Sequence, residues 1–430
     1  MRPCRTAEAD VGLRYFFTDA DGTGGRLKLT PDDFVVDEIQ DGPPEVPGGK
    51  YVVATVTVRN WETNRLIRVM SRVLGISRDV IGFAGTKDKR AVTSQLMSFR
   101  TSRERLAKLD LNDVALSDAY VANRPITIGD LVGNSFKITV REPDVPDVAP
   151  AVDEIGCMLR EAGGFPNYFG VQRFGSARPI THRIGEAIVR GDFEGAVNLY
   201  LTDPSEFEAD EVSEAREALS AMGGDFSDAP EMPKTMGFES AMVNHLRANP
   251  GDWAGAIGSL PNNLQMMFVH AYQSKIFNEI LSKRMELGLP LKTPVEGDTV
   301  IPSDARGVPS HVEPVTVTKR NRDLVMRQFR LGRAHVAAPL FGSESEFSGG
   351  EMGEIERSVI GAEGLERRDF LVPALPRCSS RGSFREIFSP VKGLSWESRG
   401  DSYVVSFSLP KGNYATCLMR EFMKSDMHLY

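Results

Sequence analysis

Sequence typical of β-strands occurs in the first third of this chain and again near its end, on either side of a long block of different composition. Residues 51–58 are mostly β-branched over the length of a strand, and strand-like patterns recur at 136–140 and 403–409. The block from about 184 to 376 contains acidic helical stretches and many prolines. If the last strands join the same sheet as the first, this block is an insertion. We therefore expect an α+β fold with a mainly antiparallel sheet and an inserted second domain.

Length and periodicity agree with this division. A chain of 430 residues is too long for one average domain, so two are expected. Apolar residues recur at helical spacing over 66–74, with Thr63 or Asn64 as the expected N-cap, and again over 267–281. Residues 26–39 predict a strand, a turn and a second strand.

Charge is distributed unevenly along the chain. The formal net charge is −8, yet residues 59–105 contain 11 basic and four acidic residues, a local balance of 11 − 4 = +7. Residues 203–231 contain ten acids and only one basic residue, Arg216, and a second basic run occupies 319–333. A basic face on an acidic protein favours selective binding of a structured polyanion such as RNA, although single runs are more often solvated surface.

The segment from Gly82 to Gln95 places one carboxylate, Asp88, between cations in a glycine-punctuated turn. Lys87, Lys89 and Arg90 flank it. Flanking positive charges keep a carboxylate ionised and are also suited to contacting phosphates. The segment does not satisfy the GxxxxGK[ST] pattern of a phosphate-binding loop. Two interpretations stay open. Either Asp88 is a reactive carboxylate beside a site for a polyanion, or the segment is a charged surface turn.

A second segment, residues 166–175, crowds three aromatic residues, Asn167 and Arg173 between prolines and glycines. Aromatic rings such as Phe169 can stack on an extruded base, and an asparagine amide can hydrogen-bond the polar edge of that base. The alternative is a packed loop in which the aromatic residues belong to the core.

Several other kinds of site are not expected. The four cysteines are scattered without a CxxC pair, and the six histidines show no HxxxH or HExxH spacing, so neither a metal site nor a disulfide framework is predicted. We expect no membrane span and no secretory signal, because no long apolar run occurs and the first residues are polar. A reducing cytoplasm is the expected compartment.

Read together, these segments resemble the TruD family of tRNA pseudouridine synthases. The resemblance rests on two long motifs, GTKDKRAVTSQ around Asp88 and PNYFGVQRFG at 166–175, with shorter matches in the same order at 28–36, 133–136, 270–274 and 407–416. Residues 290–350 carry no matching block. The resemblance implies a pseudouridine synthase catalytic domain with a mixed, mainly antiparallel sheet. That domain would comprise residues 1–183 and 377–430, interrupted at 184–376 by an inserted α/β domain specific to the family.

The resemblance also implies the reaction and the residues that perform it. Family members isomerise uridine to pseudouridine in tRNA, usually at position 13 in the D-stem region, without a cofactor or metal. By this resemblance Asp88 is the essential carboxylate, acting as nucleophile or as base. The matching positions for the active cleft are Lys28, Phe34, Asn167 and Phe169, and the residues expected to grip phosphates or support Asp88 are Lys87, Lys89, Arg90 and Arg173. We expect a cytoplasmic monomer that binds tRNA and needs no protein partner.

Two other classes of function stay open at this point. One is an RNA-binding module that has lost catalysis, against which the intact Asp88, Asn167 and Phe169 count. The other is a hydrolase that uses Asp88 as general acid or base. Such an enzyme normally needs a second carboxylate nearby, and the matched motifs contain none.

Overall fold

The computed structural model describes residues 1–4, 6–175, 177–310 and 313–430. The chain forms two compact units, each built from two segments that are far apart in the sequence. Phe17–Phe165 and Ser389–Tyr430 make one, called here the sheet unit. Met1–Phe16 and Pro166–Phe388 make the other, the helical unit. These boundaries differ from the predicted division at 183/184 and 376/377, which stays a prediction about the domains of the family.

An eight-stranded sheet forms the centre of the sheet unit, in the order β15-β16-β8-β3-β6-β4-β7, with β5 paired to β6. Among the described strands of this sheet, only β3 and β6 run parallel. The strands are β3 (Phe34–Gln40), β4 (Tyr51–Arg59), β5 (Ile81–Phe83), β6 (Val92–Phe99), β7 (Val114–Ala122), β8 (Leu131–Arg141), β15 (Lys392–Ser398) and β16 (Ser402–Pro410). The fold is thus α+β, as predicted.

The last long strand of the chain lies inside this sheet rather than at its edge. β16 pairs with β8 over nine residues, which places Phe407 opposite Phe136 and Val405 opposite Ile138. The Phe136 and Phe407 rings stack with centroids 5.3 Å apart. The expectation that the C-terminal strand completes a sheet begun in the first third of the chain is therefore confirmed.

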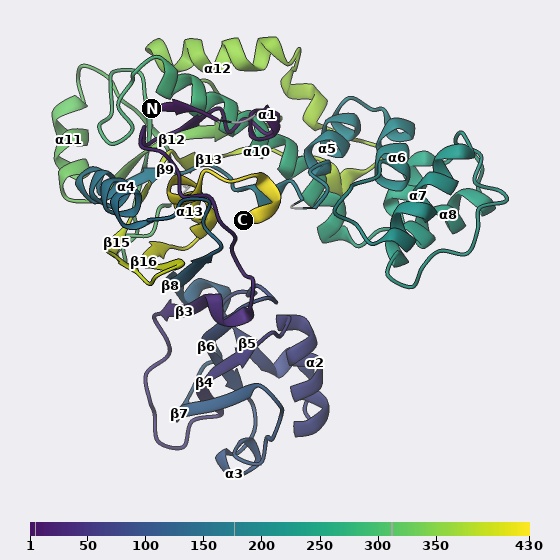
Figure 1. Cartoon of the computed structure of the whole chain (residues 1–430), viewed down its shortest axis with the longest axis horizontal. Helices are drawn as coiled ribbons and strands as arrows, with labels where there is room; N and C mark the ends of the chain where they lie inside the picture. The colour runs from purple at the N-terminus through teal and green to yellow at the C-terminus, as the bar shows by residue number, and fades with distance from the viewer. Residues whose placement is uncertain (5, 176, 311–312) are drawn as a thin grey trace. The chain divides into compact units, whose positions relative to one another are not determined.

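Helix α2 (Thr63–Leu74) covers one face of β4 and β6 (Figure 1). Its apolar residues pack on Val52, Ala54 and Val56 of β4 and on Met97 and Phe99 of β6. The helix was predicted from its periodicity, but its N-cap is Glu62 and not Thr63 or Asn64. The Glu62 carboxylate accepts hydrogen bonds from the backbone N–H groups of the second and third helical residues.

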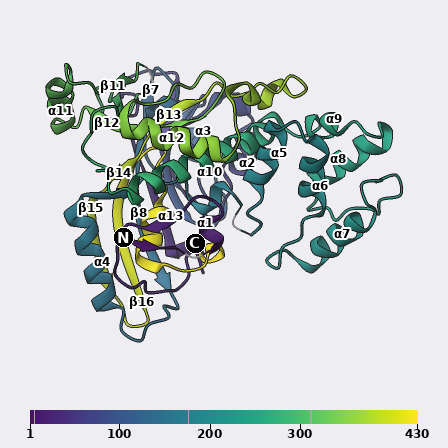
Figure 2. The same ribbon diagram turned by 90° about the horizontal axis from the view of Figure 1, so that it is seen from above.

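Helix α4 (Ala149–Ala162) packs against β15 and contacts helix α13 (Ala415–Met423) (Figure 2). The other helices of the sheet unit are α3 (Arg103–Leu106), α4 (Ala149–Ala162) and α13 (Ala415–Met423), with 3-10 turns η1 (Pro31–Asp33), η2 (Arg78–Val80), η3 (Ile128–Asp130) and η7 (Met427–Leu429). The predicted first strand of the 26–39 segment is not formed apart from a single bridge at Arg26, whereas the second strand is β3.

The helical unit is organised around α10 (Asn262–Glu286), which extends the helix predicted over 267–281 and packs on α5, α12 and β12. Its other helices are α1 (Thr6–Ala9), α5 (Thr181–Val189), α6 (Phe193–Thr202), α7 (Asp210–Ala221), α8 (Gly237–Ala248), α9 (Trp253–Gly258), α11 (Arg322–Arg330) and α12 (Gly350–Ala362), with 3-10 turns η4 (Val171–Arg173), η5 (Arg367–Phe370) and η6 (Pro376–Cys378).

A four-stranded antiparallel sheet, in the order β11-β10-β12-β13, belongs to the same unit. Its strands are β10 (Thr299–Pro302), β11 (Val315–Thr316), β12 (Ala334–Leu340) and β13 (Ser383–Glu386). A two-stranded pair joins β1 (Arg2–Pro3) to β2 (Tyr15–Phe16). The chain passes between the two units at three places: after Phe16, within β9 (Gly164–Pro166) and within β14 (Phe388–Pro390). Within the described residues, no helix is long and apolar enough to cross a membrane.

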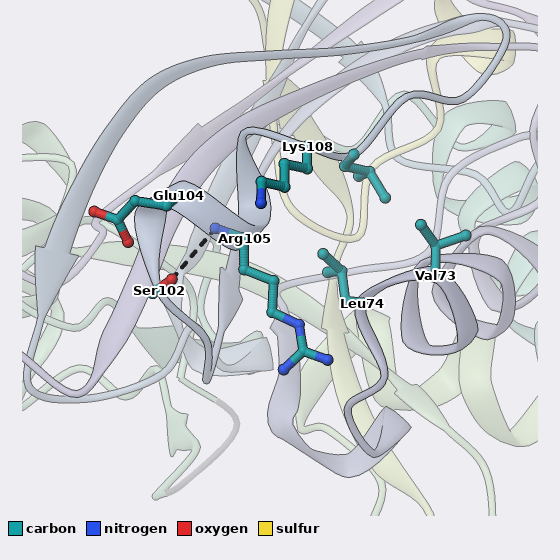
Figure 3. A pocket seen from close by; sticks show the side chains of 7 residues that line it. Val73, Leu74, Ser102, Glu104, Arg105 and Lys108 are labelled. Atoms are coloured by element: carbon teal, nitrogen blue, oxygen red, sulfur yellow. Dashed lines mark hydrogen bonds between the residues drawn. The ribbon is translucent and has the colours of Figure 1, made fainter.

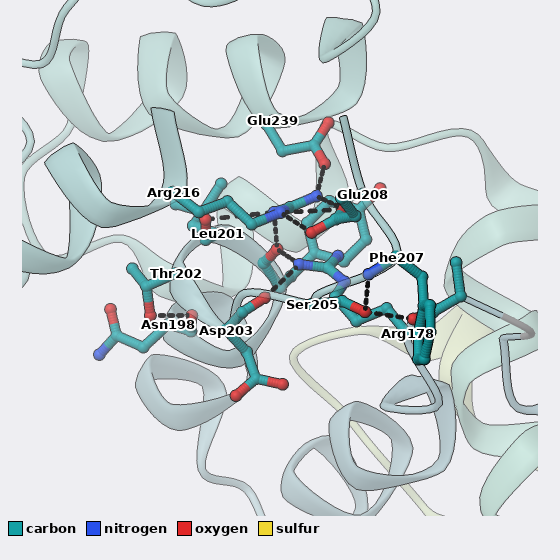
Figure 4. Close-up of polar contacts among 12 residues, drawn as sticks. Arg178, Asn198, Leu201, Thr202, Asp203, Ser205, Phe207, Glu208, Arg216 and Glu239 are labelled. Carbon is teal, nitrogen blue, oxygen red and sulfur yellow. Dashed lines mark hydrogen bonds and ion pairs between the residues drawn. The ribbon is translucent and has the colours of Figure 1, made fainter. Parts of the chain in front are cut away.

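The acidic stretch 203–231 is held by its single basic residue (Figure 4). Arg216 is buried and forms salt bridges with Glu208 and Glu239. It also donates to two backbone carbonyls at the end of α6. Arg216 therefore ties α7 to α6 and α8.

Candidate active site

Asp88 lies on the loop of residues 84–91, which connects β5 to β6. Its side chain is 58% exposed, and its Oδ2 accepts a hydrogen bond from Lys28 Nζ at 2.7 Å. The ion pair joins two segments of the sheet unit that are 60 residues apart in the sequence. The loop thus presents an accessible carboxylate whose charge is balanced by one lysine.

Lys28 is constrained by both its backbone and its side chain. Its φ of 56° is in the left-handed region, which is uncommon for a residue other than glycine. Its ammonium lies 4.3 Å from the centroid of the Phe34 ring, a cation–π contact. Phe34 is itself buried and packs edge-on against Phe136. Lys28 is therefore fixed between an aromatic ring and the carboxylate of Asp88.

The two lysines that flank Asp88 have different environments. Lys87 Nζ forms a salt bridge with Glu38, and the side chains are 8% and 0% exposed. Burial raises the pKa of Glu38, and the nearby Lys87 opposes that shift. The Lys87 backbone N–H also donates to Thr63 Oγ1 at the start of α2. Lys89, in contrast, is exposed. Lys87 thus ties the loop to β3 and to α2, and its predicted contact with phosphate is not tested by these contacts.

Arg90 makes a second link between the loop and the segment that carries Lys28. Its Nη2 donates to the Leu29 carbonyl at 3.0 Å, and the residue is otherwise exposed. The loop is therefore held at three of its residues: Lys87 contacts β3 and α2, Asp88 contacts Lys28, and Arg90 contacts Leu29.

Asn167 lies in the helical unit and is fully buried. Its Nδ2 donates to the Glu386 carbonyl and to Glu386 Oε1, while its Oδ1 accepts from Arg385 Nη2 at 2.7 Å. Both ends of the amide are thus engaged by β13. Whether this amide also hydrogen-bonds a uracil edge stays a prediction.

Phe169, two residues further on, is 6% exposed. The Arg385 guanidinium carbon lies 4.2 Å from its ring centroid, and Phe277 of α10 packs edge-on against it at 5.4 Å. Arg173 donates to Ser274 on α10 and lies 5.8 Å from the same ring. The predicted residues of this segment therefore do gather around one aromatic ring.

The sequence-predicted residues thus form two groups. Lys28 contacts both Asp88 and Phe34 in the sheet unit. Lys87, Lys89 and Arg90 lie in the same loop as Asp88, and the contacts of Lys87 and Arg90 are with Glu38, Thr63 and Leu29. Asn167, Phe169 and Arg173 belong to the helical unit. Sequence reasoning missed the partners Glu38, Thr63 and Arg385. Only Glu38 had a signal, as a charged residue within a strand-like run.

Comparison with known proteins places this geometry in context. The family model described as tRNA pseudouridine synthase D (TruD) matches residues 10–422. A Methanosarcina mazei protein named "Probable tRNA pseudouridine synthase D" is 40% identical over 431 residues, covering 97% of each chain. A Halobacterium salinarum protein of the same name is 40% identical over 439 residues, covering 99% of each. The crystal structure of a putative tRNA pseudouridine synthase D from Methanosarcina mazei is similar with a TM-score of 0.86 and 39% identity, over 99% of this chain and 100% of that one.

Proposed function

Because this chain belongs to the tRNA pseudouridine synthase D (TruD) family and is a tRNA pseudouridine synthase, we propose that it isomerises uridine 13, in the D-stem region of tRNA, with Asp88 as the catalytic carboxylate. The reaction breaks the bond between the sugar and N1 of uracil, rotates the base and joins the sugar to C5. The enzyme is proposed to act as a cytoplasmic monomer.

The observation that carries the role of Asp88 is its ion pair with Lys28. A carboxylate that is 58% exposed and held at 2.7 Å by a lysine is accessible to a substrate and has a fixed position. Either proposed role needs these properties: attack on the sugar carbon, or removal of a sugar proton. Lys28 is the proposed positioning residue, and Phe34 fixes Lys28 in turn.

Phe169 is the residue proposed to hold the detached base. A uracil within a folded tRNA must be flipped out of its stack, which costs a few kcal/mol. Stacking on an aromatic ring stabilises a base by about 1–3 kcal/mol. Phe169 is the ring proposed for this contact; it is 6% exposed, so the base has to displace the Arg385 guanidinium that lies 4.2 Å from the ring centroid. Since both ends of the Asn167 amide are engaged, we assign to Asn167 the role of positioning Arg385 against that ring. Lys89, Arg90 and Arg173 are the proposed phosphate contacts.

The test is the Asp88→Asn variant, with Asp110→Asn as a control at another exposed aspartate of the sheet unit. The substrate is tRNA tritiated at C5 of uracil, because C5 loses its hydrogen when it bonds to the sugar. Asp88→Asn is expected to abolish tritium release while tRNA binding stays within about tenfold of the wild type, since a neutral amide is neither nucleophile nor base. Retained turnover, or loss of binding, would refute the role of Asp88. Mapping the modified position in the product tests the assignment to uridine 13.

A further inference from the structure

One face of α2 carries three exposed arginines, Arg65, Arg68 and Arg72. Residues three, four and seven apart lie on the same side of a helix. In the part of the chain that the structure describes, none of the three forms a salt bridge. Residues 63–75 contain no acidic residue, and the carboxylate of the preceding N-cap, Glu62, accepts hydrogen bonds from the backbone N–H groups of the helix, with Arg68 near enough to help lower its pKa. Other cations of the 59–105 run are engaged, because Arg59 pairs with Asp32 and Arg103 with Glu45.

The opposite face of α2 fixes the orientation of these arginines. Leu66, Ile67, Met70 and Leu74 are buried against the sheet. The helix therefore cannot rotate without exposing its apolar residues to water. Arg65 is further ordered by stacking over the Trp61 ring, with its guanidinium carbon 5.4 Å from the ring centroid. The three guanidinium groups thus project from a rigid element.

The start of α2 adjoins the Asp88 loop. Thr63, the first residue of the helix, is buried, and its Oγ1 accepts the backbone N–H of Lys87, the neighbour of Asp88. With a rise of 1.5 Å per residue, Arg72 lies about 10 Å further along the helix axis than Arg65. The arginine face therefore extends away from the loop that carries the proposed catalytic carboxylate.

Beyond the C-terminal end of α2 lies an open hollow of about 500 Å³. Arg105 and Lys108 line it together with the acid Glu104 and with Val73 and Leu74 of the helix (Figure 3). Arg105 lies so close to the helix end that a Cβ on Gly75 would be 2.7 Å from its Nη2. Two further cations, Arg105 and Lys108, and one acid, Glu104, thus lie beyond the C-terminal end of α2.

We propose that the arginine face of α2, defined as Arg65, Arg68 and Arg72, binds consecutive phosphates of the tRNA backbone next to the nucleotide that reaches Asp88. Unpaired guanidinium groups in a row suit phosphate oxygens, because each can donate two parallel hydrogen bonds. RNA is favoured over another polyanion because the face begins beside the loop that the substrate must reach. The inference rests on the proposed role of Asp88 in placing the substrate, but its test reads binding and not chemistry.

The experiment compares two triple variants that change the net charge equally. The test variant is Arg65→Gln/Arg68→Gln/Arg72→Gln. The control replaces three exposed arginines that are already paired with acids, Arg306→Gln/Arg368→Gln/Arg399→Gln. Binding of unmodified tRNA is measured at several salt concentrations. The test variant is expected to bind at least tenfold more weakly, and its log–log salt slope is expected to fall by about 2 to 3, since each phosphate contact contributes about one.

The control is expected to bind tRNA within threefold of the wild type. Equal weakening in the control would show that net charge alone matters and would overturn the inference, as would an unchanged salt slope in the test variant. The variant Arg65→Lys/Arg68→Lys/Arg72→Lys keeps the charge and is expected to restore the salt slope but only part of the affinity, because an ammonium cannot donate the two parallel hydrogen bonds of a guanidinium. At saturating tRNA, kcat of the glutamine variant is expected within threefold of the wild type. If the Asp88→Asn enzyme stays active while the glutamine variant and its control bind tRNA as expected, the proposed role of Asp88 is refuted and the proposed role of the arginine face is not.

Discussion

Nζ of Lys28 donates a hydrogen bond to Oδ2 of Asp88 across 2.7 Å, and the same ammonium lies on the Phe34 ring. The lysine therefore has two neighbours of different chemistry, an aromatic face and a carboxylate. Because the ring cannot neutralise a full positive charge, Asp88 is the counter-ion that the ammonium requires. This relationship makes Lys28 the first residue whose removal should change the reactivity of Asp88.

Lys28→Met is expected to lower kcat by about 100-fold, a loss comparable to that of one preorganised donor in an active site. The variant removes the hydrogen bond that orients the Asp88 carboxylate and keeps a side chain of similar length on Phe34. Steady-state kinetics on tRNA should show the change in kcat with tRNA affinity within tenfold. Lys28→Arg keeps the charge and should lose less. A Lys28→Met enzyme with wild-type kcat would contradict the positioning role.

Lys87→Met is expected to lower the free energy of unfolding by about 3–5 kcal/mol, because it leaves the Glu38 carboxylate buried without its cation. Chemical denaturation measures the loss. The double variant Lys87→Met/Glu38→Gln removes both charges and should lose clearly less than the two single variants added together. Additive losses in this cycle would mean that the two side chains do not interact as a buried pair.

Asn167→Ala is expected to destabilise the protein by about 2–3 kcal/mol, since it removes a donor to Glu386 and an acceptor from Arg385 inside a buried site. Asn263→Ala, at an exposed position of α10, is the control and should change stability by less than about 0.5 kcal/mol. Denaturation curves compare the two. Equal stability of both variants would show that the buried amide contributes nothing to the packing around Phe169.

Glu356 on α12 should make stability depend on pH near neutrality. Burial raises its pKa to about 7, although Ser348 donates two hydrogen bonds to it. Between pH 4.5 and about 7 the unfolded chain loses this proton while the folded protein keeps it. The free energy of unfolding should therefore fall as pH rises through this window, by up to about 3 kcal/mol from this group.

Glu356→Gln cannot ionise, so the difference in unfolding free energy between wild type and variant isolates this contribution. Thermal or urea unfolding from pH 4.5 to 8 measures it. The difference is expected to change steadily up to about pH 7 and to level off above that. A difference that is constant across the range would place the pKa of Glu356 at its ordinary value.

Local patterns predicted the regular elements well, because strand alternation and helical spacing depend on neighbours in the sequence. β4, β8, β16 and the apolar face of α2 are examples. The contacts that define the site could not be predicted in this way. Lys87 and Lys89 are two residues apart in an irregular loop, and only the position of Glu38 on β3 decides that the first is buried and the second exposed.

The surroundings of Asn167 show the same limit over a longer distance. Its partner Arg385 is 218 residues away in the sequence, on a strand with no motif to mark it. The resemblance of this chain to its family identifies Asn167 as a site residue. It does not tell whether the Asn167 amide faces a ligand or another side chain. The assignment of residues 1–16 to the helical unit likewise had no signal in composition or periodicity.

The position of β16 between β15 and β8 has a consequence for the synthesis of the protein. Residues 389–430 leave the ribosome after the rest of the two units, yet they supply an interior strand of the sheet whose other strands carry Phe34 and border the Asp88 loop. A nascent chain that already contains every proposed catalytic residue therefore still exposes the edge of β8 and the ring of Phe136 to solvent. Until residues 389–430 have emerged, the sheet unit has an unpaired edge, to which a chaperone can bind.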